Sequence, residues 1–252
     1  MISKKLFNLY LFLGTFFIGN AMLAEFVGVK IFSVEHLLGI LNDPQVAGKL
    51  NMSIGVIIWP FVFITSDLLN EYFGKKGVRQ ISFITAGLIA YASVIVIVGT
   101  KLPPAKFWLD ANHLDSSGGH FNVDFAFQTI FRQGIGIVIG SITAFMVSQL
   151  VDVYVFHWVR KFTGHKWLWL RATGSTLVSQ VIDSFIILFI AFYLLGNWSL
   201  AQVFSVGTVQ YFYKIGIAIL LTPVMYLVHY FIDKYLGKDL SSNVIDKADT
   251  EW

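Results

Sequence analysis

The sequence predicts an all-α, polytopic membrane protein: a single transmembrane domain over residues 1–252, with six transmembrane helices and both termini in the cytoplasm. Three observations carry this prediction: few charged residues, six long apolar stretches, and basic residues in alternate connections. Of the 252 residues, 56% are hydrophobic and only 13% are charged, whereas soluble domains carry about 25% charged residues. This composition excludes an ordinary soluble enzyme and a disordered chain.

Six stretches of the chain are long enough to form a transmembrane helix, which needs about 20 residues. They are apolar on all faces, so they belong in lipid or in a very large core, and the chain is too short for such a core. The remaining residues 233–252 are expected to form a cytoplasmic tail. The predicted spans are residues 6–29, 52–73, 81–99, 125–156, 172–195 and 204–232.

Lys and Arg residues are concentrated in every second connection. Twelve of the 18 lie at the N-terminus, after the second and fourth stretches, and in the tail, against four in the other connections. Cytoplasmic loops carry the excess of basic residues, so both termini are expected in the cytoplasm. An alternative interpretation is that Lys4, Lys5, the first apolar run and the small residues near Ala21 form a cleavable signal peptide. That would leave five spans, and the regular alternation of basic connections argues against it.

The sequence lacks the residues that several kinds of chemistry require. It has no cysteine, which excludes disulfide scaffolds, thiolate metal sites and cysteine nucleophiles. It also lacks the motifs GxxxxGK[ST], HExxH and GxSxG of P-loop NTPases, metalloproteases and serine hydrolases. The net charge of +3 is too small to indicate a nucleic-acid partner. We therefore expect no enzymatic activity, no cofactor, no metal ion and no bound nucleic acid.

Three short segments share one pattern: a Ser, a polar residue, two aliphatic residues, and then Asn or Asp. They are SDLLN at 66–70, SQLVD at 148–152 and SQVID at 179–183, in the second, fourth and fifth predicted spans. Transporters commonly contain inverted internal repeats. The second and fifth spans would correspond in a three-plus-three arrangement, but the fourth would not. An internal repeat and a chance similarity therefore both stay open.

Ionisable residues inside the predicted spans point to function. An Asp, Lys or Arg at the centre of a membrane helix costs about 2.5–3.5 kcal/mol, so each such residue is interpreted as part of a functional site with a partner. The candidates are Glu25, Asp67, Glu71, Arg132, Asp152, Asp183 and Lys214.

Two ion pairs are compatible with the depths of these residues. At about 1.5 Å per residue, Asp183 lies about 16 Å into the fifth span and Lys214 about 15 Å into the sixth. Both are therefore near the midplane of a hydrocarbon core about 30 Å thick, where they can pair. Glu25 and Arg132 both fall in the outer third of their spans and are the second candidate pair.

Uncharged polar residues share helix faces with these charges, because residues three apart lie on one face. Two interpretations stay open for them: a ligand site inside the bundle, and hydrogen bonds that only join the helices. For Glu71, an ion pair with Lys75 near the cytoplasmic interface is the alternative to a ligand role. The pairs are Asn70 with Asp67, Gln149 with Asp152, Gln180 with Asp183, and Tyr211 with Lys214.

Three blocks of sequence carry a family resemblance. The first is SDLLNEYFGKKGVR at 66–79. The second runs from SQLVDVYVF at 148–156 to GSTLVSQVID at 174–183, and the third is QYFYK at 210–214, followed by Thr222-Pro223. Together they resemble the queuosine precursor transporter family, also called the vitamin uptake transporter family, over most of the chain.

The resemblance implies a bacterial inner-membrane protein of six spans. It implies import of 7-cyano-7-deazaguanine, with 7-aminomethyl-7-deazaguanine as a second candidate; both are precursors of the tRNA nucleoside queuosine. The family's motif positions correspond to Asp67, Asn70, Glu71, Gly74, Arg79, Arg132, Asp152, Gln180, Asp183 and Lys214.

The residue types suit such a ligand. A deazaguanine presents two donors, at its ring N–H and its amino group, which one carboxylate can accept together. Its carbonyl can accept from a Lys, Arg or Gln, and aromatic side chains can stack on its ring. We expect substrate binding by Glu25, Asp67, Asn70, Arg132, Gln180, Asp183, Tyr211 and Lys214, and structural or gating roles for Glu71, Arg79 and Asp152.

Other functions were weighed against this one. A substrate-binding subunit of a multi-component, ATP-driven vitamin or purine importer suits the length and the six spans equally well. A membrane enzyme lacks a recognised nucleophile or metal constellation, and a channel lacks a filter motif. The acids Asp67 and Asp183 are also candidates to carry a coupling proton. The lipid bilayer is the expected environment, and a homo-oligomer stays open.

Overall fold

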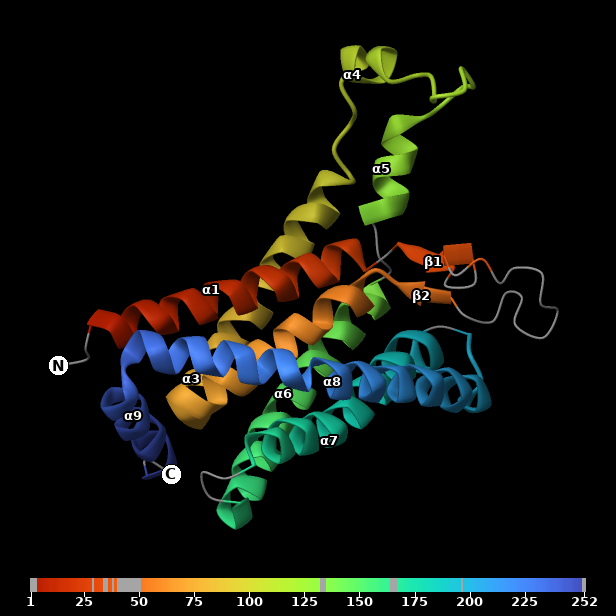
Figure 1. The fold of residues 1–252 in the computed structure, drawn as a ribbon. Helices are drawn as coiled ribbons and strands as arrows, with labels where there is room; N and C mark the ends of the chain where they lie inside the picture. Colours follow the sequence, from red (N-terminus) through yellow and green to blue (C-terminus); the bar gives the residue numbers. More distant parts are fainter. Residues whose placement is uncertain are drawn as a thin grey trace.

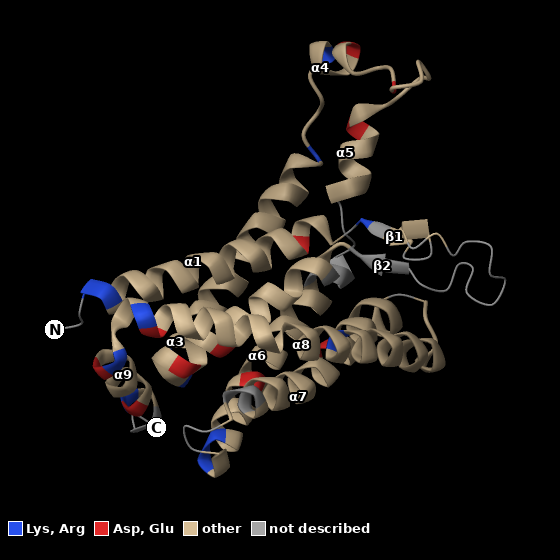
Figure 2. Ribbon diagram, viewed as in Figure 1, with Lys and Arg blue, Asp and Glu red and all other residues tan. Residues whose placement is uncertain are grey.

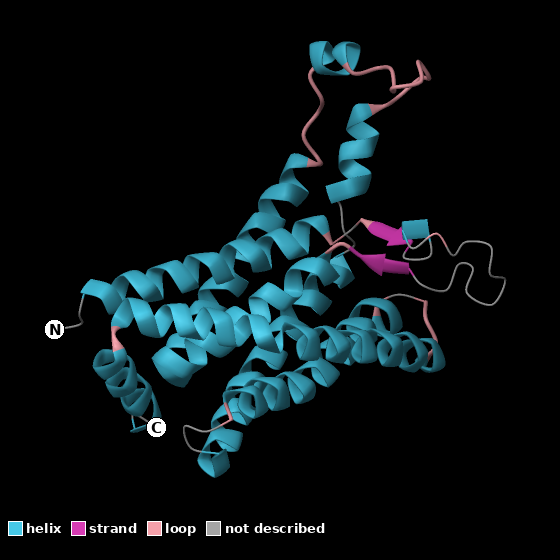
Figure 3. Cartoon of the chain, viewed as in Figure 1, coloured by secondary structure: helices cyan, strands magenta, loops and turns pink. Residues whose placement is uncertain are grey.

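The computed structural model describes residues 4–28, 30–33, 36–37, 39, 51–131, 135–163, 167–195 and 197–250. Helices dominate these residues, and one two-stranded sheet accompanies them (Figure 3). Five of the described helices are long and apolar enough to cross a membrane. The predicted all-helical, polytopic membrane class is therefore confirmed, with the small sheet as an addition.

The first helix, α1 (Lys4–Val27), agrees with the predicted span 6–29. Its buried residues Leu9, Leu13, Phe17 and Ala21 recur every four positions, so a single face packs against the bundle. A Cβ atom at Gly14 would lie 2.8 Å from Ile81 Cδ1, the end of a flexible side chain, so α1 approaches its neighbour α3 closely at this glycine.

Two short strands precede the next helix. β1 (Ile31–Ser33) and β2 (Asn51–Ser53) pair antiparallel, with Phe32 opposite Met52. The predicted span 52–73 therefore starts as a strand, and its helix starts only at Gly55.

The six predicted spans fall on five described helical elements that are long and apolar enough to cross a membrane. The predicted spans 52–73 and 81–99 belong to one helical element, α3 (Gly55–Gly99), because the residues expected to form a loop between them are helical. Its regular geometry fails at one residue, Gly74, with φ 62° and ψ −174°. This backbone conformation is accessible essentially to glycine alone.

The two parts of α3 run in opposite directions. Tyr10 near the start of α1 contacts both Phe73 and Gly77, on either side of the break. Glu25 near the end of α1 shares a small pocket with Ser93 and Val96 of the second part. The second part therefore returns along α1, as the yellow segment does in Figure 1, and Gly74 produces a helical hairpin.

The predicted span 125–156 is also corrected. The structure has a separate helix α5 (Val123–Phe131) and then α6 (Ile135–Thr163), of which 139–163 is long and apolar enough to cross a membrane. The predicted stretch is longer than the roughly 20 residues that a bilayer needs. Its first part instead lies with the short helix α4 (Lys106–Ala111) at one end of the molecule, away from the long helices (Figure 1).

The last two predicted spans are present with small shifts. α7 (Leu168–Leu188) continues into a π-helical turn, η1 (Phe189–Leu194), and α8 (Leu200–Leu236) follows. Ser199 and Gln202 cap the start of α8 reciprocally, which satisfies two backbone donors. α8 also contains Pro223, which removes one backbone hydrogen bond from the middle of a long helix.

Residues 233–252, predicted as a tail, contain the helix α9 (Lys238–Thr250), which packs against α3 and α8. α9 is rich in charged residues, whereas the long helices are mostly uncharged, with a few Asp, Glu, Lys and Arg residues along them (Figure 2). The N-terminus and the C-terminus lie at this same end of the bundle (Figure 1). This arrangement agrees with the prediction that both termini are on one side of the membrane.

The hairpin geometry predicts a specific effect of a methyl group at Gly74. Gly74→Ala forces an L-residue into a glycine-only region, and we expect it to lower the free energy of unfolding by about 1–3 kcal/mol. Thermal unfolding of the detergent-purified protein measures the loss. Gly87→Ala in the same helix is the matched control, because its Cβ atom meets open space. Equal melting temperatures of Gly74→Ala and the native protein would contradict this role of Gly74.

Candidate functional site

A cavity opens between the first part of α3, the beginning of α7 and the middle of α8. The space between these helices measures about 590 Å³ when its opening to the surroundings is included. Most of its wall is apolar, and Asp67 and Lys214 are its two ionisable side chains besides Tyr213. The described lining residues are Trp59, Pro60, Phe63, Ile64, Asp67, Ala172, Thr173, Thr176, Tyr213, Lys214, Ile217, Ala218, Leu221, Thr222 and Met225.

The ion pair expected between the fifth and sixth spans is present. Lys214 Nζ on α8 lies 2.5 Å from Asp183 Oδ2 on α7, and both side chains are largely buried. Lys214 lines the cavity, whereas Asp183 lies behind it. The pair therefore balances two charges at the cavity wall and fixes the position of the ammonium group.

Asp67 presents a carboxyl group at the wall formed by α3. Its side chain is 95% buried, and its Oδ1 atom has no hydrogen-bond partner among the described residues. Asp152 on α6 and Glu71 on its own helix act on it electrostatically, both as like charges. Because Asp67 also lines the cavity, its carboxyl group is a candidate acceptor for a ligand with N–H groups.

The three similar segments of the sequence meet beside Asp67. Ser66 Oγ in the first segment donates to Gln149 Oε1 in the second, at 3.0 Å. Ser179 Oγ in the third donates to Asp152 Oδ1 in the second, at 3.1 Å. The middle segment on α6 thus joins α3 and α7. The shared pattern places equivalent hydroxyl donors in a single buried polar layer.

Two buried amides belong to the same segments. Asn70 is fully buried and Gln180 is 1% exposed, yet neither amide group has a hydrogen-bond partner among the described residues. Neither residue lines the cavity. Because unpaired buried amides are costly, they are candidates to gain partners when a ligand or a different conformation is present.

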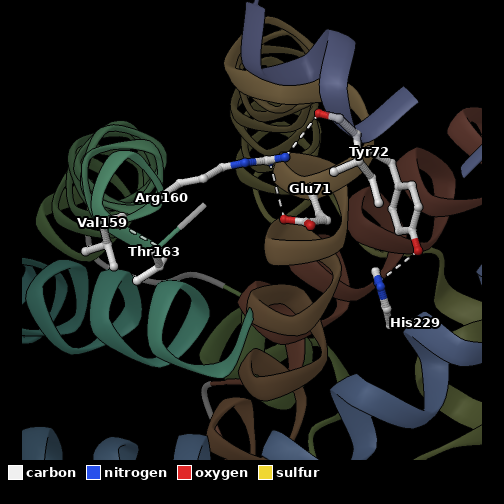
Figure 4. Close-up of polar contacts among 7 residues, drawn as sticks. Glu71, Tyr72, Val159, Arg160, Thr163 and His229 are labelled. Carbon is white, nitrogen blue, oxygen red and sulfur yellow. Dashed lines mark hydrogen bonds and ion pairs between the residues drawn. The ribbon is translucent and has the colours of Figure 1, made fainter. Parts of the chain in front are cut away.

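Glu71 pairs with Arg160 of α6 at 3.3 Å, and both side chains are almost fully buried. The ammonium group of Lys75, which the sequence offered as an alternative partner of Glu71, lies over the ring of Tyr154. Arg160 also donates to the carbonyl of Ile245 in α9, at 3.0 Å, so one guanidinium joins three helices (Figure 4). From the sequence, Arg160 was expected among the basic residues of a loop. The residues next to it in the chain give no indication that it forms a buried ion pair.

A second buried network escaped the sequence analysis. The hydroxyl of Tyr72 on α3 lies 2.8 Å from His229 Nδ1 on α8 (Figure 4) and donates to Asp233 Oδ1 at 2.8 Å. Ser241 of α9 donates to the same carboxylate. These contacts attach α9 to α3 just before its break at Gly74 and to the end of α8.

The remaining predicted residues are distributed more widely. Glu25 accepts a hydrogen bond of 2.6 Å from Ser141 of α6 and lines a separate pocket of about 350 Å³. Its expected partner Arg132 lies outside the described residues. Tyr211 is not among the residues that line the cavity, whereas Tyr213 is, one helical turn before Ile217 on the lining face of α8. Arg79 is exposed shortly after the break in α3.

Long apolar helices with buried charges beside a cavity are typical of polytopic membrane proteins that bind a ligand within the bundle. The chain belongs to the vitamin uptake transporter family, since the family model described as "Putative vitamin uptake transporter" matches residues 53–228. Membership of the family, expected from the motif blocks, is thus confirmed, and it is a family of transporters rather than enzymes.

Three curated relatives are similar over most of the chain. A "Probable queuosine precursor transporter" of Bacillus subtilis (strain 168) is 26% identical, covering 84% of this chain and 86% of the relative. The relative of the same name from Haemophilus influenzae is 29% identical, covering 73% and 69%. The "Queuosine precursor transporter" of Escherichia coli (strain K12) is 30% identical, covering 77% and 82%. No solved structure matches the chain.

The Glu71–Arg160 pair predicts a large effect on stability. Arg160→Gln leaves the Glu71 carboxylate buried without its cation, and we expect it to destabilise the protein by about 3–5 kcal/mol. The double variant Glu71→Gln/Arg160→Gln should recover part of this loss, because it removes both charges. Thermal unfolding measures both effects, with Arg79→Gln as the exposed control. A single variant that melts like the native protein would show that the pair does not hold α6 against α3.

Proposed function

We propose that this protein imports queuosine precursors, namely 7-cyano-7-deazaguanine and, as a second candidate, 7-aminomethyl-7-deazaguanine, across the bacterial inner membrane. The observation that carries the proposal is the cavity between α3, α7 and α8, with the acceptor Asp67 and the donor Lys214 in an otherwise apolar wall. The names of the curated relatives supply the class of substrate.

The cavity is chemically complementary to a flat deazapurine. The carboxylate of Asp67 can accept hydrogen bonds from the ring N–H and the amino group together. Lys214 can donate to the ring carbonyl while its other hydrogens remain on Asp183. Trp59 and Phe63, stacked with ring centroids 5.8 Å apart, form an aromatic wall for the ligand ring.

The path of the chain fits six crossings of the membrane, with the hairpin at Gly74 supplying two of them. Both termini would then lie in the cytoplasm, as the excess of basic residues requires. Irregular helix positions adjoin the cavity, since Pro60 lines it and Thr222 precedes Pro223. Such positions allow helices to bend, so alternating access around the cavity is the mechanism we infer.

The role of Asp67 predicts a loss of affinity when its charge is removed. Asp67→Asn weakens a charge-assisted hydrogen bond worth about 1.5–3 kcal/mol, so we expect at least about a tenfold rise in the Kd for 7-cyano-7-deazaguanine. Equilibrium binding to purified protein measures it. Asp110→Asn is the control, because Asp110 is an exposed carboxylate in α4, a helix that does not line the cavity. This variant should leave the Kd unchanged.

Unchanged affinity in Asp67→Asn would remove Asp67 from the site while leaving the substrate in place. Absence of binding to folded native protein would contradict the proposed substrate. Co-purification of an ATPase subunit would favour the ATP-driven importer instead.

The aromatic wall predicts a second effect. Trp59→Leu retains an apolar side chain but removes the larger ring, and we expect about a 5- to 50-fold loss of affinity, because stacking on a base is worth about 1–3 kcal/mol. The same binding assay measures it. The control is Trp158→Leu, since Trp158 lies exposed on the outer face of α6. Equal losses in the two variants would show that ring stacking at Trp59 does not hold the ligand.

A further inference from the structure

The buried polar layer holds more carboxylates than cations among the described residues. Asp67, Glu71 and Asp152 are each at most 5% exposed, and Arg160 is the buried guanidinium beside them. Arg160 is engaged by Glu71 and by a carbonyl of α9. Asp67 and Asp152 are therefore left without an ion-pair partner of their own in the described part of the layer.

The surrounding charges do not supply that partner. Lys214 lines the same cavity as Asp67, but its ammonium group lies 2.5 Å from Asp183. The polar neighbours of Asp152 on α7 are hydroxyl groups, with Ser179 donating to Oδ1. The titratable and charged groups on the helices packed around the two acids are Glu71 on α3, His157 and Arg160 on α6, Asp183 on α7, Tyr213, Lys214 and His229 on α8, and Glu25 on α1.

Both acids also have an unpaired oxygen atom. Asp67 Oδ1 and Asp152 Oδ2 are inaccessible to solvent and have no hydrogen-bond partner in the described structure. If both carboxyl groups were ionised inside the bundle, each would have lost its hydration free energy, and the two negative charges would repel each other. One proton removes one of the charges and turns one oxygen from an acceptor into a donor.

We propose that the carboxyl groups of Asp67 and Asp152 hold one proton between them, and that this proton crosses the membrane together with the imported ligand. This inference rests on the proposed function and deepens it, because it names the ion coupled to transport. Asp67 faces the cavity and Asp152 lies behind it, in contact with α7. The two acids thus connect the ligand site to the buried layer.

The proton and the ligand are linked through Asp67. A deazapurine donates two hydrogen bonds, so it binds best to Asp67 as a carboxylate. The O–H bond on Asp67 then breaks and an O–H bond forms on Asp152, with no proton gained or lost by the protein. Asp152 keeps its hydrogen bond from Ser179 in either state. The loaded transporter accordingly carries one ligand and one proton.

Infrared spectroscopy of the ligand-free protein tests the proton site. We expect the C=O stretching band of a protonated carboxyl group at neutral pH, and its loss in the double variant Asp67→Asn/Asp152→Asn. The single variants should each change the band, which keeps the test valid if the double variant fails to fold. Glu25→Gln, a matched buried acid outside the pair, should retain it. A band absent from the native protein, or one that survives in the folded double variant, overturns the proposal.

Proteoliposomes test the coupling. An inward proton gradient should raise the accumulation of labelled 7-cyano-7-deazaguanine several-fold, and Asp152→Asn should lose this dependence, whereas Asp110→Asn should keep it. Equal uptake by the native protein with and without the gradient overturns the coupling. If folded native protein takes up no label under either condition, the proposed function fails as well. The infrared band still decides in that case whether the two acids share a proton.

Discussion

Buried charges in a membrane-spanning bundle must find partners on neighbouring helices, because lipid offers none. In this protein Arg160 meets the requirement at one end of the bundle, where it joins α6 to Glu71 of α3 and to α9. Lys214 meets it at the cavity, where it joins α8 to Asp183 of α7. These two cations connect four of the five long helices and α9, so the positions of the helices depend on where the charges are paired.

The same requirement explains the polar layer formed by the three similar segments. Two of their Ser hydroxyls donate across helix interfaces, Ser66 to Gln149 and Ser179 to Asp152. Ser148 of the middle segment donates within its own helix, to the carbonyl of Phe145. Gln149 therefore joins two helices, whereas Asp67 lines the cavity and keeps one oxygen without a hydrogen-bond partner among the described residues.

Two prolines lie in the helices that form the cavity. Pro60 of α3 lines it, and Pro223 of α8 directly follows the lining residue Thr222. Each proline removes one backbone hydrogen bond of its helix, and backbone groups released in this way in a membrane helix need other partners.

The sequence by itself determined the membrane class, the approximate spans and the family, and it offered Asp183 and Lys214 as a possible pair. Hydropathy, the positions of basic residues and the rise of a helix are local properties, so they do not depend on how the helices pack. Only the tertiary structure decided that α3 reverses direction at Gly74, that Arg160 pairs with Glu71, that Asp183 contacts Lys214, and that Tyr213 rather than Tyr211 lines the cavity. Such choices depend on the rotation and tilt of each helix against its neighbours, and spacing along one chain does not contain that information.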